Sequence, residues 1–254
     1  MIKPFLKWVG GKTQIINELI EYFPKKINNY HEIFLGGGSV LFYILQNKNI
    51  EITGNIYAYD INSTLIYTYK NIQNNYQEVY NTLKELITTF KNCNGNEKNT
   101  KTNNYIEALK SKENFYYYTR IKYNSMTEED KKSIMGSSLF IFLNKTCFRG
   151  LYRIGPNGFN VPYGHYKNPE IINLEHLKKI HELIKNVIFI DCDFKQSICN
   201  IKKDDFYYLD PPYYPENKKS FVNYTSNGFN LENHKLLFQL IKEKNNSFVM
   251  RHIL

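Results

Sequence analysis

The chain has 254 residues, and 42% of them are hydrophobic. This is enough to form either one large domain or a core domain with a second, smaller lobe. Lys and Arg outnumber Asp and Glu by 33 to 24, and the net charge of +9 suggests a polyanionic partner without identifying nucleic acid. No apolar run approaches the length of a membrane span and no signal peptide is evident, so we expect neither secretion nor membrane insertion.

The four cysteines are far apart in the sequence: Cys93, Cys147, Cys192 and Cys199. They form no CxxC pair and no spacing typical of a metal site, so we expect no bound metal. Reduced thiols favour the cytoplasm or another reducing intracellular compartment.

The N-terminal part alternates helix and strand signals. Residues 13–23 have helical spacing and are followed by Pro24. Residues 31–48 indicate a short strand, a glycine turn and a helix, and residues 56–73 indicate a strand ending at Asp60 and then a helix capped by Asn62 or Ser63. This βαβ pattern predicts a parallel sheet with helices on its faces.

The middle of the chain has a different character. Residues 71–140 are predicted to be mostly helical, with a polar loop at 91–104. Residues 138–166 are aromatic and basic, and Gly-Pro-Asn-Gly at 155–158 predicts a hairpin. Strand and helix signals then resume through the helix at 231–244 and a strand starting near 247. We therefore expect an α/β core, 1–70 and 166–254, split by an insertion at 71–165.

The stretch "FLKWVGGKT" (5–13) is not a phosphate-binding P-loop, because that motif needs glycine where Leu6 stands. It places Lys12 just before a helix, where a cation and free backbone N–H groups suit a carboxylate ligand. A plain helix-start turn is the alternative.

A second glycine turn, "FLGGGSV" (34–40), lies between a strand and a helix, where backbone can approach a ligand closely. Asp60 follows Gly38 at a distance typical of an acid that binds ribose hydroxyls, although such an acid is often only a helix cap. Turn and acid together favour an adenosine cofactor, S-adenosylmethionine rather than NAD. Asp193 and Phe194 end another strand and suit an adenine ring, with a surface loop as the alternative.

The stretch "LDPPYYP" (209–215) is the most specific. Asp210 ends an apolar run, so we expect it at the carboxyl edge of the sheet. The prolines fix a backbone carbonyl, which together with the carboxylate makes two acceptors for an amino group. Tyr213 adds a flat ring, so the predicted guest is a nucleobase with an exocyclic amine.

These motifs, with "YDIN", "LNKTCFRGLYRIGPNGFNVPYG" and "FVNYTSNGF", run in order from residue 4 to about 229. The chain resembles the Dam-type DNA adenine-N6 methyltransferases. The resemblance implies an α/β fold with a Rossmann-like S-adenosylmethionine-dependent methyltransferase sheet and an inserted, mostly helical DNA target-recognition domain carrying a β-hairpin. It implies site-specific methylation of a flipped-out adenine in a short duplex sequence.

The resemblance also implies roles for single residues. The catalytic clamp would be Asp210, Pro211, Pro212 and Tyr213. Cofactor contacts would come from Trp8, Lys12, Phe34, Gly36, Gly37, Gly38, Asp60, Asp193, Phe194 and Asp210. DNA contacts would come from Lys7, Phe148, Arg149, Arg153, Asn160, Tyr163 and Tyr224. Arg153 would read guanine, and Phe148 and Arg149 would wedge into the duplex, although the family more often has Asn where Arg149 stands.

Two rival readings remain open. One alternative is methylation of cytosine N4 or of a protein amide, because each also presents a planar –NH₂ group. The chain ends just as another core strand begins, so a DNA-binding relative with impaired catalysis is the other alternative. We expect double-stranded DNA as partner, a monomer, and an association with a restriction endonuclease system as a further possibility. A short palindrome containing adenine is the expected site, with GATC as one candidate.

Overall fold

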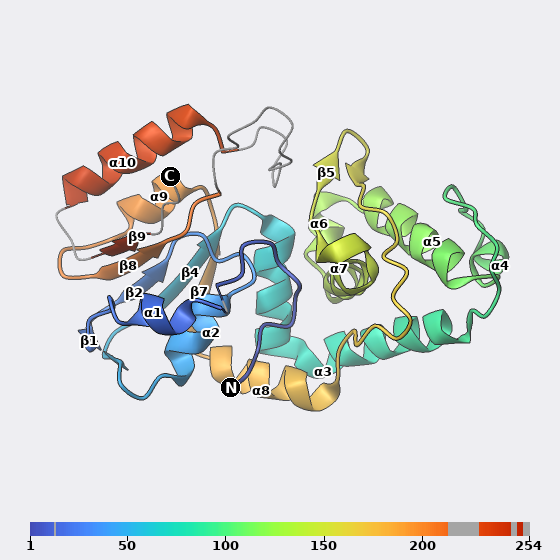
Figure 1. Cartoon of the computed structure of the whole chain (residues 1–254), viewed down its shortest axis with the longest axis horizontal. Coiled ribbons are helices and arrows are strands. Elements are labelled where there is room, and N and C mark those ends of the chain that lie inside the picture. Colours follow the sequence, from blue (N-terminus) through green and yellow to red (C-terminus); the bar gives the residue numbers. More distant parts are fainter. Residues whose placement is uncertain (13, 213–228, 245–247, 251–254) are drawn as a thin grey trace. The chain divides into compact units, whose positions relative to one another are not determined.

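The computed structural model describes residues 1–12, 14–212, 229–244 and 248–250 (Figure 1). The chain forms two compact units. Unit 1 comprises Met1–Lys3, Gly10–Ile66 and Leu183–Leu254, and unit 2 comprises Pro4–Val9 and Tyr67–Glu182. These bounds differ from the sequence-based ones at 70 and 165, and the short segment Pro4–Val9 joins the second unit although it lies near the N-terminus.

Unit 1 contains a parallel sheet. In the described part of the chain its strands run in the order β7-β4-β2-β8-β9, and every neighbouring pair is parallel. This confirms the predicted α/β class and the strand that begins near residue 247. The strands are β2 (Tyr30–Glu32), β4 (Ile56–Asp60), β7 (Val187–Asp191), β8 (Phe206–Leu209) and β9 (Phe248–Met250).

Helices cover both faces of this sheet (Figure 1). On one face, Tyr59, Tyr207 and Leu209 pack with the buried residues of α9 (Phe194–Cys199) and α10 (Leu231–Lys244). On the other face, Phe23 lies against the rings of Tyr30, Phe206 and Tyr208, on the side of α1 (Ile16–Ile20) and α2 (Ser39–Gln46). Successive residues of β8 point to opposite faces and all four are buried, so this strand is covered on both faces, as expected for a parallel sheet.

The helix predicted over 13–23 is shorter than expected. Helix α1 covers only Ile16–Ile20, and the next three residues form turns whose N–H groups bond three residues back, as in Tyr22 to Leu19 at 3.3 Å. Such tightening is common in the last turn of a helix and here precedes Pro24. The β1 (Lys26–Ile27) and β3 (Glu51–Ile52) pair is a small addition that the sequence did not predict.

The strand order identifies where a ligand site belongs. Along the chain, β2, β4 and β7 are added in one direction, and β8 and β9 are added on the other side of β2. The connections therefore diverge between β2 and β8, which is the topological switch point where open α/β sheets bind ligands, beyond the carboxyl ends of the strands.

Unit 2 is mostly helical. Its main helices α5 (Lys112–Ser125) and α7 (Ile134–Thr146) pack around buried aromatic rings such as Phe115 and Phe142, 5.8 Å apart. The Gly-Pro-Asn-Gly turn joins an antiparallel hairpin, which confirms that prediction. The remaining elements are α3 (Ser63–Asn92, kinked at Asn75), α4 (Tyr105–Ala108), α6 (Glu128–Lys131), η1 (Phe148–Gly150), β5 (Ile154–Gly155), β6 (Gly158–Phe159) and α8 (Leu174–Ile184).

Within the described residues, no helix combines the length and hydropathy needed to cross a lipid bilayer.

Candidate active site

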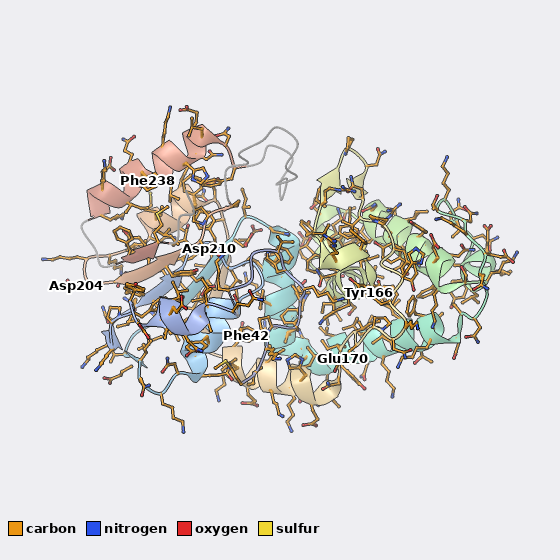
Figure 2. The ribbon with its side chains drawn as sticks, viewed as in Figure 1. Phe42, Tyr166, Glu170, Asp204, Asp210 and Phe238 are labelled. Carbon is orange, nitrogen blue, oxygen red and sulfur yellow. The ribbon has the colours of Figure 1, made fainter. Side chains whose placement is uncertain are left out.

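The site in unit 1 is built where β2 and β8 end. The glycine turn follows β2 and leads into α2, and Asp210 directly follows β8 (Figure 2). Because β2 and β8 are hydrogen-bonded neighbours, the two motifs lie side by side at the switch point. The sequence predicted Asp210 at the carboxyl edge and the glycine turn between a strand and a helix, and the strand order brings them together.

Lys12 and Asp210 form an ion pair at this edge. Lys12 Nζ lies 2.6 Å from Asp210 Oδ2, and the side chains are only 4% and 18% exposed. Lys12 Nζ also donates to the Gly10 carbonyl at 2.8 Å, and the Lys12 backbone N–H donates to Ser39 Oγ at 3.2 Å. The Gly-Gly-Lys turn therefore connects the start of α2 to the end of β8.

Asp60 anchors the glycine turn. Its Oδ2 accepts the Gly36 N–H at 2.9 Å and its Oδ1 accepts the Asn62 N–H at 2.9 Å. Gly36 and Gly38 have φ values of 50° and 69°, where residues with a Cβ are strained. Burial raises the pKa of Asp60, and hydrogen bonds from the backbone N–H groups of Asn62, Gly36 and Ile61 oppose that rise. Each carboxylate oxygen has a further lone pair for a ligand hydroxyl.

Three aromatic rings stand near this edge on the face covered by α9 and α10. Phe34 lies 6.1 Å from Phe194 and 5.7 Å from Phe229, and Phe194 lies 5.4 Å from Phe229. Asp193 caps α9, because its Oδ1 accepts the Lys195 N–H at 2.8 Å. The structure thus groups Phe34 with Phe194 and gives Asp193 a structural role that the sequence did not predict.

The proline turn is only partly described. Pro211 is buried and Pro212 is half-buried. Tyr213 and Tyr224 lie outside the described residues.

In unit 2, Asn144 fastens two of the predicted DNA-contact segments together. Its Oδ1 accepts the Lys7 N–H at 2.9 Å, and its Nδ2 donates to the carbonyls of Lys7 at 2.8 Å and Gly150 at 3.2 Å. Gly150 has φ of 64°, and a Cβ there would meet the Lys7 side chain. The Lys7 ammonium lies 3.8 Å from the centre of the Tyr166 ring, a cation–π contact.

Arg153 and Asn160 face each other across the hairpin. Arg153 Nε donates to Asn160 Oδ1 at 2.6 Å and its guanidinium donates to the Asn160 carbonyl at 3.3 Å. The Asn160 N–H in turn donates to the Arg153 carbonyl at 3.1 Å. The hairpin therefore holds the arginine in a defined direction.

The other predicted contacts of unit 2 occupy different environments. Phe148 is 45% exposed, and the Arg149 guanidinium lies 5.2 Å from the centre of its ring, with Arg149 at a left-handed φ of 55°. Tyr163, in contrast, is 7% exposed and packs against Phe90 and other core rings. Trp8 stacks on Tyr152, with ring centres 5.6 Å apart.

Three residues at these sites were not singled out from the sequence: Glu32, Asn144 and Phe229. Glu32 is an acid directly before the apolar residues Ile33, Phe34 and Leu35, which was the available signal. Phe229 is the last residue of the stretch "FVNYTSNGF", and the sequence alone indicates no role for it. Asn144 is one of many asparagines, and its position gave no signal.

The model of the D12 class N6 adenine-specific DNA methyltransferases matches residues 8–253, nearly the whole chain. The chain belongs to this family. The match includes β2 with the glycine turn, residues 67–182 of unit 2, and β8 with Asp210.

Named relatives agree with the family. The Type II methyltransferase M.MjaIII of Methanocaldococcus jannaschii is 40% identical over 236 residues, covering 90% of this chain and 75% of the relative. The Type II methyltransferase M1.LlaDCHI of Lactococcus lactis subsp. cremoris is 31% identical, covering 95% and 77%. A DNA adenine methylase of Haemophilus influenzae is also 31% identical, covering 94% and 74%.

This adenine methyltransferase therefore methylates the N6 amine of adenine in DNA, as the Dam-type resemblance implied. The cytosine and non-catalytic alternatives are not favoured by these matches. No cluster of three or more His, Cys, Asp or Glu that could hold a metal occurs among the described residues.

Proposed function

We propose that this DNA adenine methyltransferase uses S-adenosylmethionine, held at the switch point of unit 1, and that Asp210 and Pro211 clamp the target amine. The observation that carries the proposal is the Lys12–Asp210 ion pair beside the glycine turn, since it places a buried cation and a carboxylate at one edge. When bound, the cofactor supplies an electrophilic methyl group on a sulfonium.

The residues present fit this cofactor. Lys12 is a buried cation that suits the amino-acid carboxylate. Gly36 and Gly38 have positive φ values, which favour glycine, and the absence of side chains at Gly36, Gly37 and Gly38 leaves the approach to the α2 N-terminus open. Asp60 retains lone pairs for ribose hydroxyls, Phe34 and Phe194 suit the adenine ring, and Asp193 suits its amine.

The chain's own groups prepare the target nitrogen. The adenine leaves the duplex, because its amine is otherwise buried in base pairing. Asp210 and the Pro211 carbonyl accept the two N6–H hydrogen bonds, which favours a tetrahedral nitrogen with a localised lone pair. The same bonds stabilise the positive charge that develops on that nitrogen. Pro212 stiffens the turn, and Tyr213, outside the described residues, is proposed to stack on the base.

Unit 2 is proposed to recognise the DNA target, chiefly through residues 71–165. Arg153 suits bidentate contact to guanine O6 and N7, and Asn160 orients it. Phe148 is exposed enough to enter the base stack beside Arg149. Lys7 suits a base edge or a phosphate.

Three further predicted contacts act in different ways in this proposal. Tyr163 is proposed to support Phe148 from the core. Pro162, the residue before Tyr163, accepts the Phe148 N–H at 2.8 Å through its carbonyl. Trp8 and Tyr224 stay as predicted contacts with cofactor and DNA, respectively.

We further propose a monomer that methylates a short palindrome containing adenine. Two relatives carry the name Type II methyltransferase, which supports an association with a restriction endonuclease. This association is tested in host cells that lack this enzyme: their DNA should be cleaved by the associated endonuclease, because its sites are no longer methylated.

The test is transfer of a tritiated methyl group to plasmid free of methylation, followed by mapping of modified adenines. Asp210→Asn keeps the shape of the side chain, and we expect it to lower turnover by about three orders of magnitude or more while DNA affinity changes little. Unchanged turnover in that variant would overturn the assignment of the clamp. Asp204→Asn, an exposed acid of the same unit, is the matched control.

A further inference from the structure

Glu32 is a buried acid for which the proposed reaction has no use. It is the last residue of β2, in the middle of the sheet, and is 2% exposed. Charged residues are almost never buried this deeply unless they are paired or hydrogen-bonded, so its surroundings should reveal its role.

Two donors contact the Glu32 carboxyl group. The Tyr30 hydroxyl donates to Glu32 Oε2 at 2.8 Å, from the same face of the strand. The Leu41 backbone N–H, in the first turn of α2, also bonds the carboxyl group. Gly38, at the N-cap of α2, has no side chain to satisfy that turn, so Glu32 caps the helix that follows the glycine turn.

Glu32 also lies beside the clamp. It pairs in register with Tyr208 of β8, and Asp210 is two residues further along, on the same face. The charge of Asp210 acts on Glu32. Lys12 is the cation paired to Asp210, at 2.6 Å, and Ala58 pairs with Glu32 from β4, whose last residue is Asp60.

The ionisation of Glu32 is shifted by these surroundings. Burial, and to a lesser extent the negative charge of Asp210, raise the pKa of Glu32, while the Tyr30 and Leu41 hydrogen bonds lower it, and the net result is a pKa of about 8. Tyr30 itself has a raised pKa, first because of burial and then because of Glu32, so it remains a donor. Glu32 is thus mostly protonated at neutral pH.

We propose that Glu32 is a positioning residue for methyl transfer: while protonated, it caps α2 and leaves the pair of Lys12 and Asp210 intact, and its ionisation disrupts that pair. This inference rests on the proposed role of Asp210. A second negative charge beside Asp210 repels the Asp210 carboxylate and so weakens its pair with Lys12. The loss of the proton should therefore weaken both cofactor binding and the orientation of Asp210.

The experiment is the pH profile of kcat/KM for the cofactor with the full-length enzyme and unmethylated plasmid. For the unsubstituted enzyme we expect a fall of about tenfold per pH unit above the Glu32 pKa. Glu32→Gln, which is similar in shape and always neutral, should lose this alkaline fall. Tyr30→Phe keeps the ring but removes a hydrogen bond that favours the charged form, so its fall should move to higher pH.

These outcomes separate the two proposals. An alkaline fall that is the same in Glu32→Gln, or that does not move in Tyr30→Phe, would overturn the role of Glu32 while an inactive Asp210→Asn still supports the clamp. An active Asp210→Asn would overturn both. If Glu32→Gln fails to fold, as circular dichroism would reveal, the Tyr30→Phe shift decides, since a purely structural role for Glu32 would not move the profile.

Discussion

The Lys12 ammonium lies 2.6 Å from the Asp210 carboxylate, joining a segment near the N-terminus of the chain to the end of β8. Each of the two side chains is positioned by contacts with other parts of unit 1. Lys12 is held by the Gly10 carbonyl and by Ser39 of α2, and Asp210 by the strand that precedes it. The pair makes the glycine turns and the proline turn parts of one site.

Breaking this pair should cost stability as well as activity. We expect Lys12→Met to lower the free energy of unfolding by about 3 kcal/mol, because it leaves the Asp210 charge partly buried without the lysine. The double variant Lys12→Met with Asp210→Asn should recover most of that loss, since no charge is then stranded. Urea unfolding measures both. Lys203→Met, at an exposed position, is the control and should change stability by less than about 0.5 kcal/mol.

Asn160 should act on sequence recognition through Arg153. Arg153→Ala is expected to cost about 1–3 kcal/mol of discrimination at one base pair, and Asn160→Ala a smaller amount at the same position. The measurement compares kcat/KM on the preferred site with sites changed at single base pairs. The double variant should be no worse than Arg153→Ala, and full additivity would contradict the coupling. Lys122→Ala, an exposed cation of unit 2, should weaken binding equally for all sequences.

Asn144 should support DNA binding from within unit 2. Asn144→Ala leaves the N–H and carbonyl groups of Lys7 without their partner, at a cost of about 1–3 kcal/mol in unfolding free energy. We also expect weaker DNA binding, because Lys7 and the Phe148–Gly150 turn are no longer fixed to each other. Fluorescence anisotropy with a labelled duplex measures this effect. Asn49→Ala, an exposed asparagine of unit 1, should change neither quantity.

His31 should make the fold sensitive to mild acid. The buried ring bonds the Tyr59 hydroxyl at 3.0 Å and Asp205 at 3.1 Å, and burial lowers the pKa of His31 although Asp205 opposes that effect. Below pH 6.5 the unfolded chain binds a proton at this residue more readily than the folded chain does, so stability falls as the pH falls. Urea unfolding between about pH 5 and 7.5 measures the slope. His31→Gln should have a shallower slope, and an identical slope would refute the assignment.

The elements of unit 1 were predictable because their signals are local. The strand ending at Asp60, a cap at Asn62 or Ser63 and the apolar run before Asp210 each follow from the pattern of neighbouring residues. Of the two candidate caps, Asn62 accepts the Leu65 N–H at 3.1 Å. The helix at 13–23 was overestimated, since its apolar spacing continues through residues that wind more tightly before Pro24. Two-residue strands such as β1 lack enough residues to show any period.

The sequence by itself determined the α/β class, the hairpin and the identity of the motifs, since periodicity, glycine and proline act on the backbone over a few residues. Only the tertiary structure decided which of those motifs meet. The order of the strands places Asp210 beside the glycine turn, the register places Glu32 beside Asp210, and three hydrogen bonds join Asn144 to Lys7 and Gly150. These relationships depend on contacts between residues distant in the chain, and on burial, which changes the ionisation of an acid in a way that its neighbours in sequence do not reveal.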